Sequence, residues 1–304
     1  MKFDGILFFP VTPFDVHGRV DTAVLEQHLE TSLTHSPGGV FPACGTGEFH
    51  ALSASEAAGV VRTTVDVVAG RVPVVAGAGG PLGHALEVAR AAADAGADGL
   101  LVLPPYLVGG PQAGLAAYVE AIAEASPLPV VVYHRGTAVY SPDTVRRLVA
   151  NPKVVGFKDG VGDIGTAQLI VRAVAEEGRD DVAFFNGLLT AELTQAAYRG
   201  IGIPLYSSAA FAMAPDIANA YYRAYVDGDE ERRLALVDGF YAPLVRLRDE
   251  TPGFGVSLIK AGLRLAGLPV GSVRPPLVDP TPEQEERLAG ILASGRALLE
   301  SAAV

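Results

Sequence analysis

The sequence predicts a (β/α)8 barrel, an α/β fold, followed by a C-terminal helical extension. Two observations predict this fold. Eight short apolar runs recur over about 225 residues, and segments with helical periodicity separate them. Runs that are uniformly apolar are typical of parallel strands covered on both faces. Because composition does not change along these units, we expect one closed barrel at residues 1–226 and a helical extension at residues 227–304.

The expected strands are short, and glycine and proline residues separate them from the helical segments that follow. The strands are expected at 6–11, 40–43, 72–76, 100–103, 130–133, 154–157, 182–185 and 203–206. The helical segments between them are 22–32, 53–68, 86–95, 115–125, 144–150, 164–177 and 191–198. Further helical patterns follow at 217–225, 230–248, 255–266 and 283–299, which is more helix than a bare barrel needs. We expect this extension to pack on the barrel or on another subunit.

Two helix starts carry specific capping signals. Ser53 stands three residues before Glu56, the spacing of a capping box in which each side chain satisfies a backbone amide of the first turn. Ser141 is followed by Pro142, which predicts an N-cap with proline at the first helical position.

An open, doubly wound sheet is the alternative architecture. That fold often carries a glycine-rich fingerprint after its first strand, whereas the glycine-rich stretch here, residues 77–83, follows the third. Its sequence, Gly-Ala-Gly-Gly-Pro-Leu-Gly, has Leu82 where the third glycine of G-x-G-x-x-G belongs. A tight turn between strand and helix explains the stretch better.

Composition and charge exclude several function classes. The chain has 304 residues, and 23 basic against 34 acidic side chains give a net charge of −11. This balance argues against nucleic acid or an anionic membrane as a partner, although a few local cations suffice for a small anion. The lone Cys44 excludes an internal disulfide framework and fits a reducing compartment. With no signal peptide at the start and no apolar run long enough to span a membrane, we expect a soluble cytoplasmic protein.

Lys158 gives the strongest indication of chemistry. The chain has only four lysines against nineteen arginines, yet Lys158 directly follows the apolar run 154–157. A lysine at the wall of an apolar barrel is desolvated, which lowers its pKa and favours the neutral amine. A neutral amine condenses with a ketone to form an iminium that accepts electrons. The alternative is a solvated lysine at the rim, or one that pairs with Asp159.

Three other groups are expected at the same end of the barrel. Tyr133 ends the fifth strand, where a phenol can transfer protons, although a core aromatic residue is the commoner role there. Side chains alternate along a strand, so Arg135 should point inward with Tyr133 and act as a carboxylate clamp or form an ordinary salt bridge, while His134 points outward. The Gly45-Thr46-Gly47 stretch offers amides and a hydroxyl as an anion cradle, unless it is simply a tight turn.

The remaining polar candidates are less specific. Glu48 is an acid–base candidate or a structural hydrogen-bonding group. The six histidines show no paired spacing with carboxylates on one helix, so no metal site is predicted.

These residues, taken in order, resemble the dihydrodipicolinate synthase/N-acetylneuraminate lyase family of Schiff-base barrel enzymes. The landmarks are Pro-Val-Thr-Pro-Phe at 10–14, Gly-Thr-Gly-Glu at 45–48, Gly-Ala-Asp-Gly at 96–99, Tyr133, and Gly-Phe-Lys-Asp at 156–159. The resemblance covers almost the whole chain. It implies that Lys158 forms the Schiff base, that Tyr133 is the acid–base phenol, and that Thr46 and Gly47 hold the carboxylate beside the reacting ketone.

Departures from the common pattern point to one branch of that family. Gly45 replaces the first threonine of the usual Gly-Thr-Thr-Gly-Glu motif, and Leu107 stands where a second tyrosine is common. Both changes remove hydroxyls of the synthase proton relay. Together with Tyr-x-Arg-Gly at 133–136 and Tyr-Ser-Ser at 206–208, the pattern is similar to the 5-dehydro-4-deoxyglucarate dehydratase branch, in which His50 and His134 are departures.

The resemblance implies dehydration and decarboxylation of a six-carbon keto-diacid to 2,5-dioxopentanoate, with no metal or organic cofactor. Ser208 is expected with Thr46 and Gly47 around one carboxylate, Arg135 at the other polar end of the substrate, and Asn186 near its hydroxyls. The implied assembly is a homodimer or homotetramer. The alternatives are another Schiff-base aldolase or synthase acting on pyruvate or a 2-keto-3-deoxy sugar acid, and a catalytically dead barrel that senses a ligand.

Overall fold

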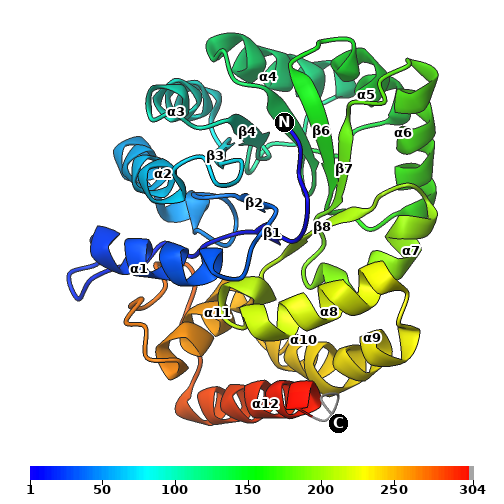
Figure 1. Cartoon of the computed structure of the whole chain (residues 1–304). Coiled ribbons are helices and arrows are strands. Elements are labelled where there is room, and N and C mark those ends of the chain that lie inside the picture. Colours follow the sequence, from blue (N-terminus) through cyan, green and yellow to red (C-terminus); the bar gives the residue numbers. More distant parts are fainter. Residues whose placement is uncertain (301–304) are drawn as a thin grey trace.

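A computed structural model of the chain, in which residues 1–300 are described, contains eight parallel strands ringed by helices (Figure 1). The strands are β1 Leu7–Phe8, β2 Gly39–Val40, β3 Val75–Ala78, β4 Gly99–Val102, β5 Val130–His134, β6 Val154–Asp159, β7 Ala183–Asn186 and β8 Leu205–Ser208. Their order is β2-β1-β8-β7-β6-β5-β4-β3, and a parallel bridge from Val40 to Val74 joins the two ends. The predicted barrel is confirmed.

Proline accounts for strands that are shorter or shifted relative to the expected runs. Pro10 and Pro42 have no amide proton to donate, and the paired segments β1 and β2 end before them. Pro204 lies inside the run expected at 203–206, so the paired strand β8 begins only at Leu205 and continues to Ser208. The carboxyl end of β8 therefore lies two residues further along the chain than expected.

The barrel helices follow the strands in the expected alternation. They are α1 Thr22–Leu33, α2 Ala54–Val68, α3 Leu82–Asp94, α4 Gln112–Ala125, α5 Pro142–Val149, α6 Ile164–Glu176, α7 Gln195–Gly200 and α8 Pro215–Asp227. Ser53 and Glu56 form the predicted capping box at the start of α2. Ser141 accepts a hydrogen bond from the Thr144 amide at the start of α5, with Pro142 in its first turn. The segment expected as one helix at 191–198 is instead a 3-10 turn, η2 Ala191–Leu193, followed by α7.

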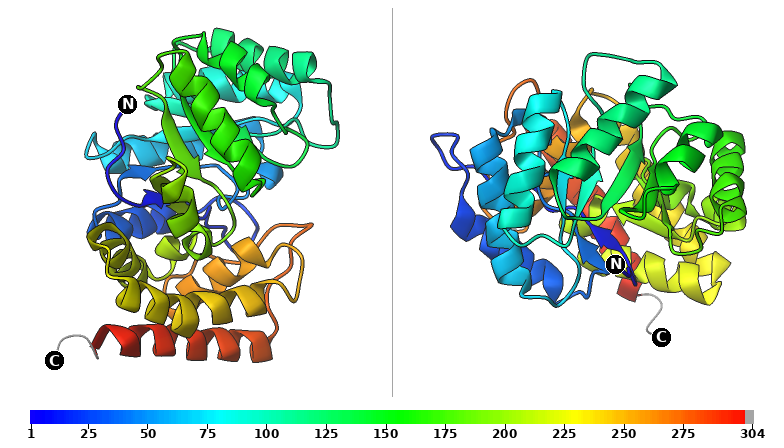
Figure 2. Two further views of the ribbon diagram at one scale, coloured as in Figure 1. Left: turned by 90° about the vertical axis from the view of Figure 1, so that its right-hand side faces the viewer. Right: turned by 90° about the horizontal axis from the view of Figure 1, so that it is seen from above.

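The C-terminal part is helical, as predicted. It contains α9 Glu230–Leu236, a π-helical turn η4 Val237–Tyr241, α10 Ala242–Arg248, α11 Phe254–Leu265 and α12 Pro282–Glu300. These helices lie together beside one end of the barrel (Figure 1; Figure 2, left). The boundary expected between residues 226 and 227 falls at the end of α8, and residues 301–304 of the predicted extension lie outside the described residues.

The barrel interior and most of the space between the sheet and the helices form a large apolar core, and a smaller cluster centred on Ala167, Tyr198 and Ile203 lies apart from it. Seen from above, the strands lie in the middle and the helices surround them (Figure 2, right). In the described part of the chain, no helix is long and apolar enough to span a membrane.

Candidate active site

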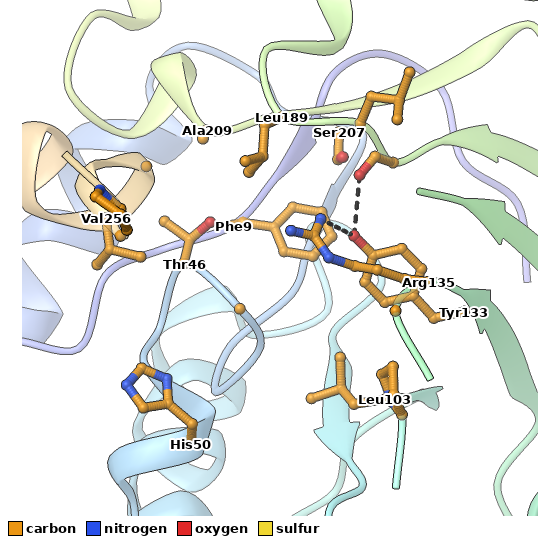
Figure 3. A pocket seen from close by; sticks show the side chains of 18 of the residues that line it. Phe9, Thr46, His50, Leu103, Tyr133, Arg135, Leu189, Ser207, Ala209 and Val256 are labelled. Carbon is orange, nitrogen blue, oxygen red and sulfur yellow. Dashed lines mark hydrogen bonds between the residues drawn. The ribbon is translucent and has the colours of Figure 1, made fainter. Parts of the chain in front are cut away.

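A pocket of about 770 Å³ lies where the carboxyl ends of the strands meet the loops that follow them. This is the face on which barrels of this type carry their active sites. Its wall combines apolar and cationic groups from the barrel and the C-terminal helices (Figure 3). The lining residues include Phe9, Thr46, His50, Leu103, Leu107, Tyr133, Arg135, Lys158, Leu189, Ser207, Arg248 and Val256.

Lys158 lies on the inward-facing rung of the barrel. Strand register places it between Tyr133 of β5 and Phe185 of β7, and it is only 4% exposed. Its Nζ lies 3.9 Å from the ring centroid of Phe9 and 4.4 Å from that of Tyr133. Removal from water, which disfavours the charged form, lowers the pKa of Lys158 to about 7, and the nearby Arg135 acts in the same direction. A large fraction of this amine is therefore neutral near pH 7.

A glycine makes room for the lysine side chain. A Cβ atom added at Gly187 would lie 2.5 Å from Cε and 2.6 Å from Cγ of Lys158, well inside normal contact distance. Gly187 is therefore required for the lysine to lie where it does.

Tyr133 and Arg135 act on the same oxygen atom. The Tyr133 hydroxyl donates a hydrogen bond to the Gly187 carbonyl over 3.0 Å, and Arg135 Nη1 donates to the same hydroxyl oxygen over 2.9 Å (Figure 3). Burial raises the pKa of Tyr133, while the Arg135 guanidinium opposes that rise. The phenol is thus protonated at neutral pH, with a cation beside it that stabilises the phenolate formed when it gives up its proton. The inward orientation predicted for both side chains agrees with the pocket lining.

The turn that carries Thr46 is tightly built. Thr12 Oγ1 donates to the Gly47 carbonyl over 2.7 Å, and the Glu48 amide donates to the Gly45 carbonyl. Within residues 1–300, the amides of Thr46 and Gly47 donate no hydrogen bond to a protein acceptor. Their donors are thus unused within this described part of the protein, and the anion-binding role expected for this turn stays a prediction. Gly45 and Thr46 line the pocket, whereas Gly47 is buried behind them.

The structure does not bring Asn186 and Ser208 into the pocket lining. Asn186 Nδ2 donates to Thr194 Oγ1 and Gln195 Oε1, and Ser208 Oγ donates to Glu192. Both side chains are fully buried and already hydrogen-bonded within the protein. The expected contacts of Asn186 with the substrate hydroxyls and of Ser208 with a carboxylate are therefore replaced by these structural hydrogen bonds. The inward position at the end of β8 belongs to Ser207, which lines the pocket.

His134 and Glu48 have structural partners. His134 points away from the pocket, as expected, but is buried, and its Nδ1 accepts a hydrogen bond from the Tyr140 amide. Glu48 forms an ion pair of 2.6 Å with Lys260 on α11. Of the two roles considered for Glu48, the structure supports the structural one.

Sequence reasoning missed the contribution of the C-terminal helices. Arg248 at the end of α10 and Val256 in α11 both line the pocket, although the extension was expected only to pack on the barrel or another subunit. Phe9 was also missed, because the first expected strand was considered only as an apolar run.

Within residues 1–300, no group of three or more His, Cys, Asp or Glu side chains is arranged to hold a metal ion.

The fold and the pocket define the chain as a (β/α)8-barrel enzyme with a lysine-centred site that acts on a small molecule. A model of the family described as "Dihydrodipicolinate synthetase family" matches residues 2–294. The chain therefore belongs to the dihydrodipicolinate synthetase family, which confirms the family resemblance inferred from its motifs.

Individual relatives cover the chain almost end to end. It is 52% identical to a Streptomyces griseus subsp. griseus protein named "Probable 5-dehydro-4-deoxyglucarate dehydratase", over 97% of this chain and 92% of that protein. A protein of Acidovorax ebreus with the same name is 41% identical, over 95% of this chain and 94% of its own length. The crystal structure of dihydrodipicolinate synthase from Oceanobacillus iheyensis is 28% identical, with a TM-score of 0.88 and 97% coverage of both chains.

Proposed function

We propose that this enzyme is a 5-dehydro-4-deoxyglucarate dehydratase that converts its substrate to 2,5-dioxopentanoate, water and carbon dioxide. The observation that carries the proposal is the buried Lys158 amine beside Tyr133, in a chain 52% identical to a relative with that name. The lysine supports the class of chemistry, and the relative supports the choice of substrate.

The reaction begins at the C5 ketone. Neutral Lys158 Nζ attacks C5, and loss of water gives an iminium. Loss of a C4 proton then forms an enamine, whose electrons expel the C3 hydroxyl as water. Tyr133 is the group proposed to protonate the departing hydroxyl and to carry the C4 proton, because its hydroxyl is protonated at neutral pH and Arg135 stabilises its anion.

Decarboxylation follows from the conjugation created by the elimination. The C3–C4 double bond is now conjugated with the C5 iminium, so the C1–C2 bond can break: its electron pair forms a C2–C3 double bond, the C3–C4 pair moves to C4–C5, and the C5–N pair moves to the nitrogen. Carbon dioxide leaves, and the enol at C2 becomes the aldehyde when C3 is protonated. Protonation at C4 and hydrolysis of the imine release 2,5-dioxopentanoate and return Lys158 to its free form. The atoms balance as one water and one carbon dioxide lost from the substrate.

The two carboxylates need different environments. We propose that the amides of Thr46 and Gly47 hold the C6 carboxylate, which stays next to the ketone and is retained. Arg135 is proposed to contact the other polar end of the substrate. Charge-assisted hydrogen bonds of this kind supply orientation as well as affinity.

A family synthase or aldolase that uses pyruvate is the second candidate, favoured by the shared fold with the solved dihydrodipicolinate synthase of Oceanobacillus iheyensis. Gly45 and Leu107 both line the pocket but carry no side-chain hydroxyl for a proton relay, which weighs against a synthase. The third candidate, a catalytically dead sensor, does not need a desolvated lysine next to a phenol.

Two activity assays on the same enzyme preparation distinguish these candidates. We expect carbon dioxide release from 5-dehydro-4-deoxyglucarate, and little or no condensation of pyruvate with aspartate semialdehyde, with Lys158→Ala as the blank. Efficient condensation without carbon dioxide release would overturn the dehydratase proposal and favour the synthase. Loss of both activities in the parent enzyme would favour the sensor.

The enzyme is further proposed to act in the cytoplasm as a homodimer or homotetramer. The free Cys44 thiol suits a reducing compartment, and the apolar side chains Leu107 and Val108 are exposed in the loop between β4 and α4. Light scattering coupled to size-exclusion chromatography tests the assembly, and a monomer at micromolar concentration would contradict it.

A further inference from the structure

A fully buried ion pair joins the loop after β2 to the C-terminal helix α11. Glu48 Oε1 and Lys260 Nζ are 2.6 Å apart, and both side chains are 0% exposed. We propose that this pair is a positioning device, which holds the Thr46–Gly47 turn in the conformation that recognises the substrate carboxylate. The inference rests on the proposed function only in assigning a carboxylate to that turn.

Glu48 occupies a backbone conformation that needs support from its surroundings. Its φ is 56°, in the left-handed region, where residues other than glycine are disfavoured. Ala43, at the start of the same loop, also has a positive φ of 49°. Two unfavourable positions within one short loop persist only when surrounding contacts fix them, and the buried ion pair supplies such a contact at Glu48.

Both carboxylate oxygens of Glu48 are engaged by the C-terminal part of the chain. Oε1 contacts Lys260, and Oε2 accepts a hydrogen bond of 2.8 Å from the Arg274 amide. Arg274 extends the connection, because its guanidinium donates to the Ala51 carbonyl and to Glu56 on α2. The loop is therefore held from the C-terminal side at more than one point.

Within residues 1–300, Lys260 Nζ contacts Glu48 and two further neighbours. Nζ donates to the Ser272 carbonyl over 3.0 Å and lies 4.0 Å from the ring centroid of Phe14. A charge buried this completely is costly when its partner is removed, so the two groups keep each other in place. In a chain with four lysines, one is thus used for the pocket and another for the loop beside it.

The link from the pair to the turn is short and rigid. Glu48 directly follows Gly47, whose carbonyl accepts from Thr12. A Cβ at Gly47 would lie 3.1 Å from the Ala43 amide nitrogen and 3.2 Å from the Pro10 carbonyl oxygen, so the turn already packs closely on the barrel. Moving Glu48 therefore moves the amides of Thr46 and Gly47. Lys158 is on β6, and the pairing of β6 with β5 and β7 places it in the barrel wall.

This geometry separates two properties that one experiment can measure. Carboxylate recognition should depend on the pair, whereas the reactivity of the Lys158 amine should not. Pyruvate has a ketone next to a carboxylate, and acetone has the ketone alone. We therefore choose borohydride trapping of each ketone on Lys158, followed by mass spectrometry, in the full-length enzyme.

The variants are Glu48→Gln, which keeps shape but removes charge, and Lys260→Met. We expect the pyruvate concentration for half-maximal trapping to rise about tenfold in each, the loss typical of a displaced hydrogen-bonding group, with the acetone trapping rate unchanged. Lys260→Arg keeps the charge and should recover most of the pyruvate affinity. Lys153→Met is the matched control, because the Lys153 ammonium donates to the Ala123 and Ser126 carbonyls, before β6, and its loss should change the trapping of neither ketone.

Two results would overturn the inference. One is parent-like half-saturation by pyruvate in Glu48→Gln or, if that variant does not fold, in Lys260→Met. The other is an equal loss of trapping with pyruvate and acetone, which indicates general damage to the barrel. A parent enzyme that traps pyruvate but releases no carbon dioxide from the keto-diacid would refute the proposed function while leaving this test of the ion pair valid.

Discussion

Replacing Gly187 with alanine should displace the reactive lysine without removing any functional group. The added Cβ would lie 2.5 Å from Lys158 Cε and 2.6 Å from Cγ, whereas ordinary contacts begin at 3.4 Å. The third close atom, the Asp159 carbonyl oxygen at 2.9 Å, belongs to the backbone of β6, which the sheet holds in place. The lysine side chain is therefore the group that must shift, by about 1 Å. The φ of Gly187 is not in the left-handed region, so alanine brings no backbone strain there.

A displacement of this size has a large kinetic consequence. A misplacement of about 1 Å costs roughly a hundredfold in rate, or about 2.7 kcal/mol of transition-state stabilisation. We expect kcat/KM for carbon dioxide release from the keto-diacid to fall by about that factor, while overpacking lowers the free energy of unfolding by about 1–3 kcal/mol. The assay combines steady-state kinetics with urea unfolding, so that loss of folded protein is separated from loss of catalysis.

The matched control is Gly59→Ala. Gly59 lies inside α2, and nothing stands within 4 Å of a Cβ built there. That variant should keep full activity and gain about 0.5–1 kcal/mol of stability, because alanine is the better helix former. If Gly187→Ala retained kcat/KM within about twofold of the parent, the argument that Lys158 is held at its catalytic position by close packing would be wrong.

Three further predictions follow from the site. Because burial lowers the pKa of Lys158 to about 7 and only the neutral amine attacks the ketone, kcat/KM should fall about tenfold per pH unit below that value and level off above it; a flat profile from pH 5 to 9 would contradict this. Arg135→Ala should lose roughly ten- to a hundredfold in kcat/KM, since Arg135 bonds to the Tyr133 hydroxyl and lines the pocket, and unchanged kinetics would place it outside the mechanism. Asn186→Ala should lower the free energy of unfolding by about 1–3 kcal/mol in urea, because it removes the buried hydrogen bonds from Asn186 to Thr194 Oγ1 and Gln195 Oε1, while KM of the folded enzyme stays the same; a raised KM with normal stability would return Asn186 to the substrate site.

The sequence predicted the barrel, and the positions of Lys158 and Tyr133 at the ends of their strands, because both depend on local patterns. Apolar strands covered on both faces are visible as continuous runs, and alternation along β5 correctly placed Tyr133 and Arg135 inward and His134 outward. The same alternation, applied from strand to strand across the sheet, places the Asn186 side chain away from the pocket. Strand register pairs Asn186 with Asp159, on the outward-facing rung next to that of Lys158.

Ser208 was misplaced for a related reason. The expected strand ends at Tyr206, which puts both serines after it, whereas Pro204 shifts the paired strand β8 to Leu205–Ser208. Ser207 then faces the pocket, and Ser208 faces Glu192.

Other features depend on contacts between distant parts of the chain. No local pattern links Glu48 to Lys260, or brings Arg248 and Val256 of the C-terminal helices into the pocket. These contacts exist only once the helices pack beside the barrel (Figure 1).

Borohydride reduction in the presence of 5-dehydro-4-deoxyglucarate tests the central claim most directly. If Lys158 forms the iminium that drives elimination and decarboxylation, mass spectrometry of the digested enzyme will find one reduced adduct, on the peptide that contains Lys158, and activity will be lost in proportion to its formation. Lys158→Arg, whose guanidinium stays protonated, will form no adduct and release no carbon dioxide. Normal turnover by Lys158→Arg, or an adduct on Lys260 instead, would contradict the account.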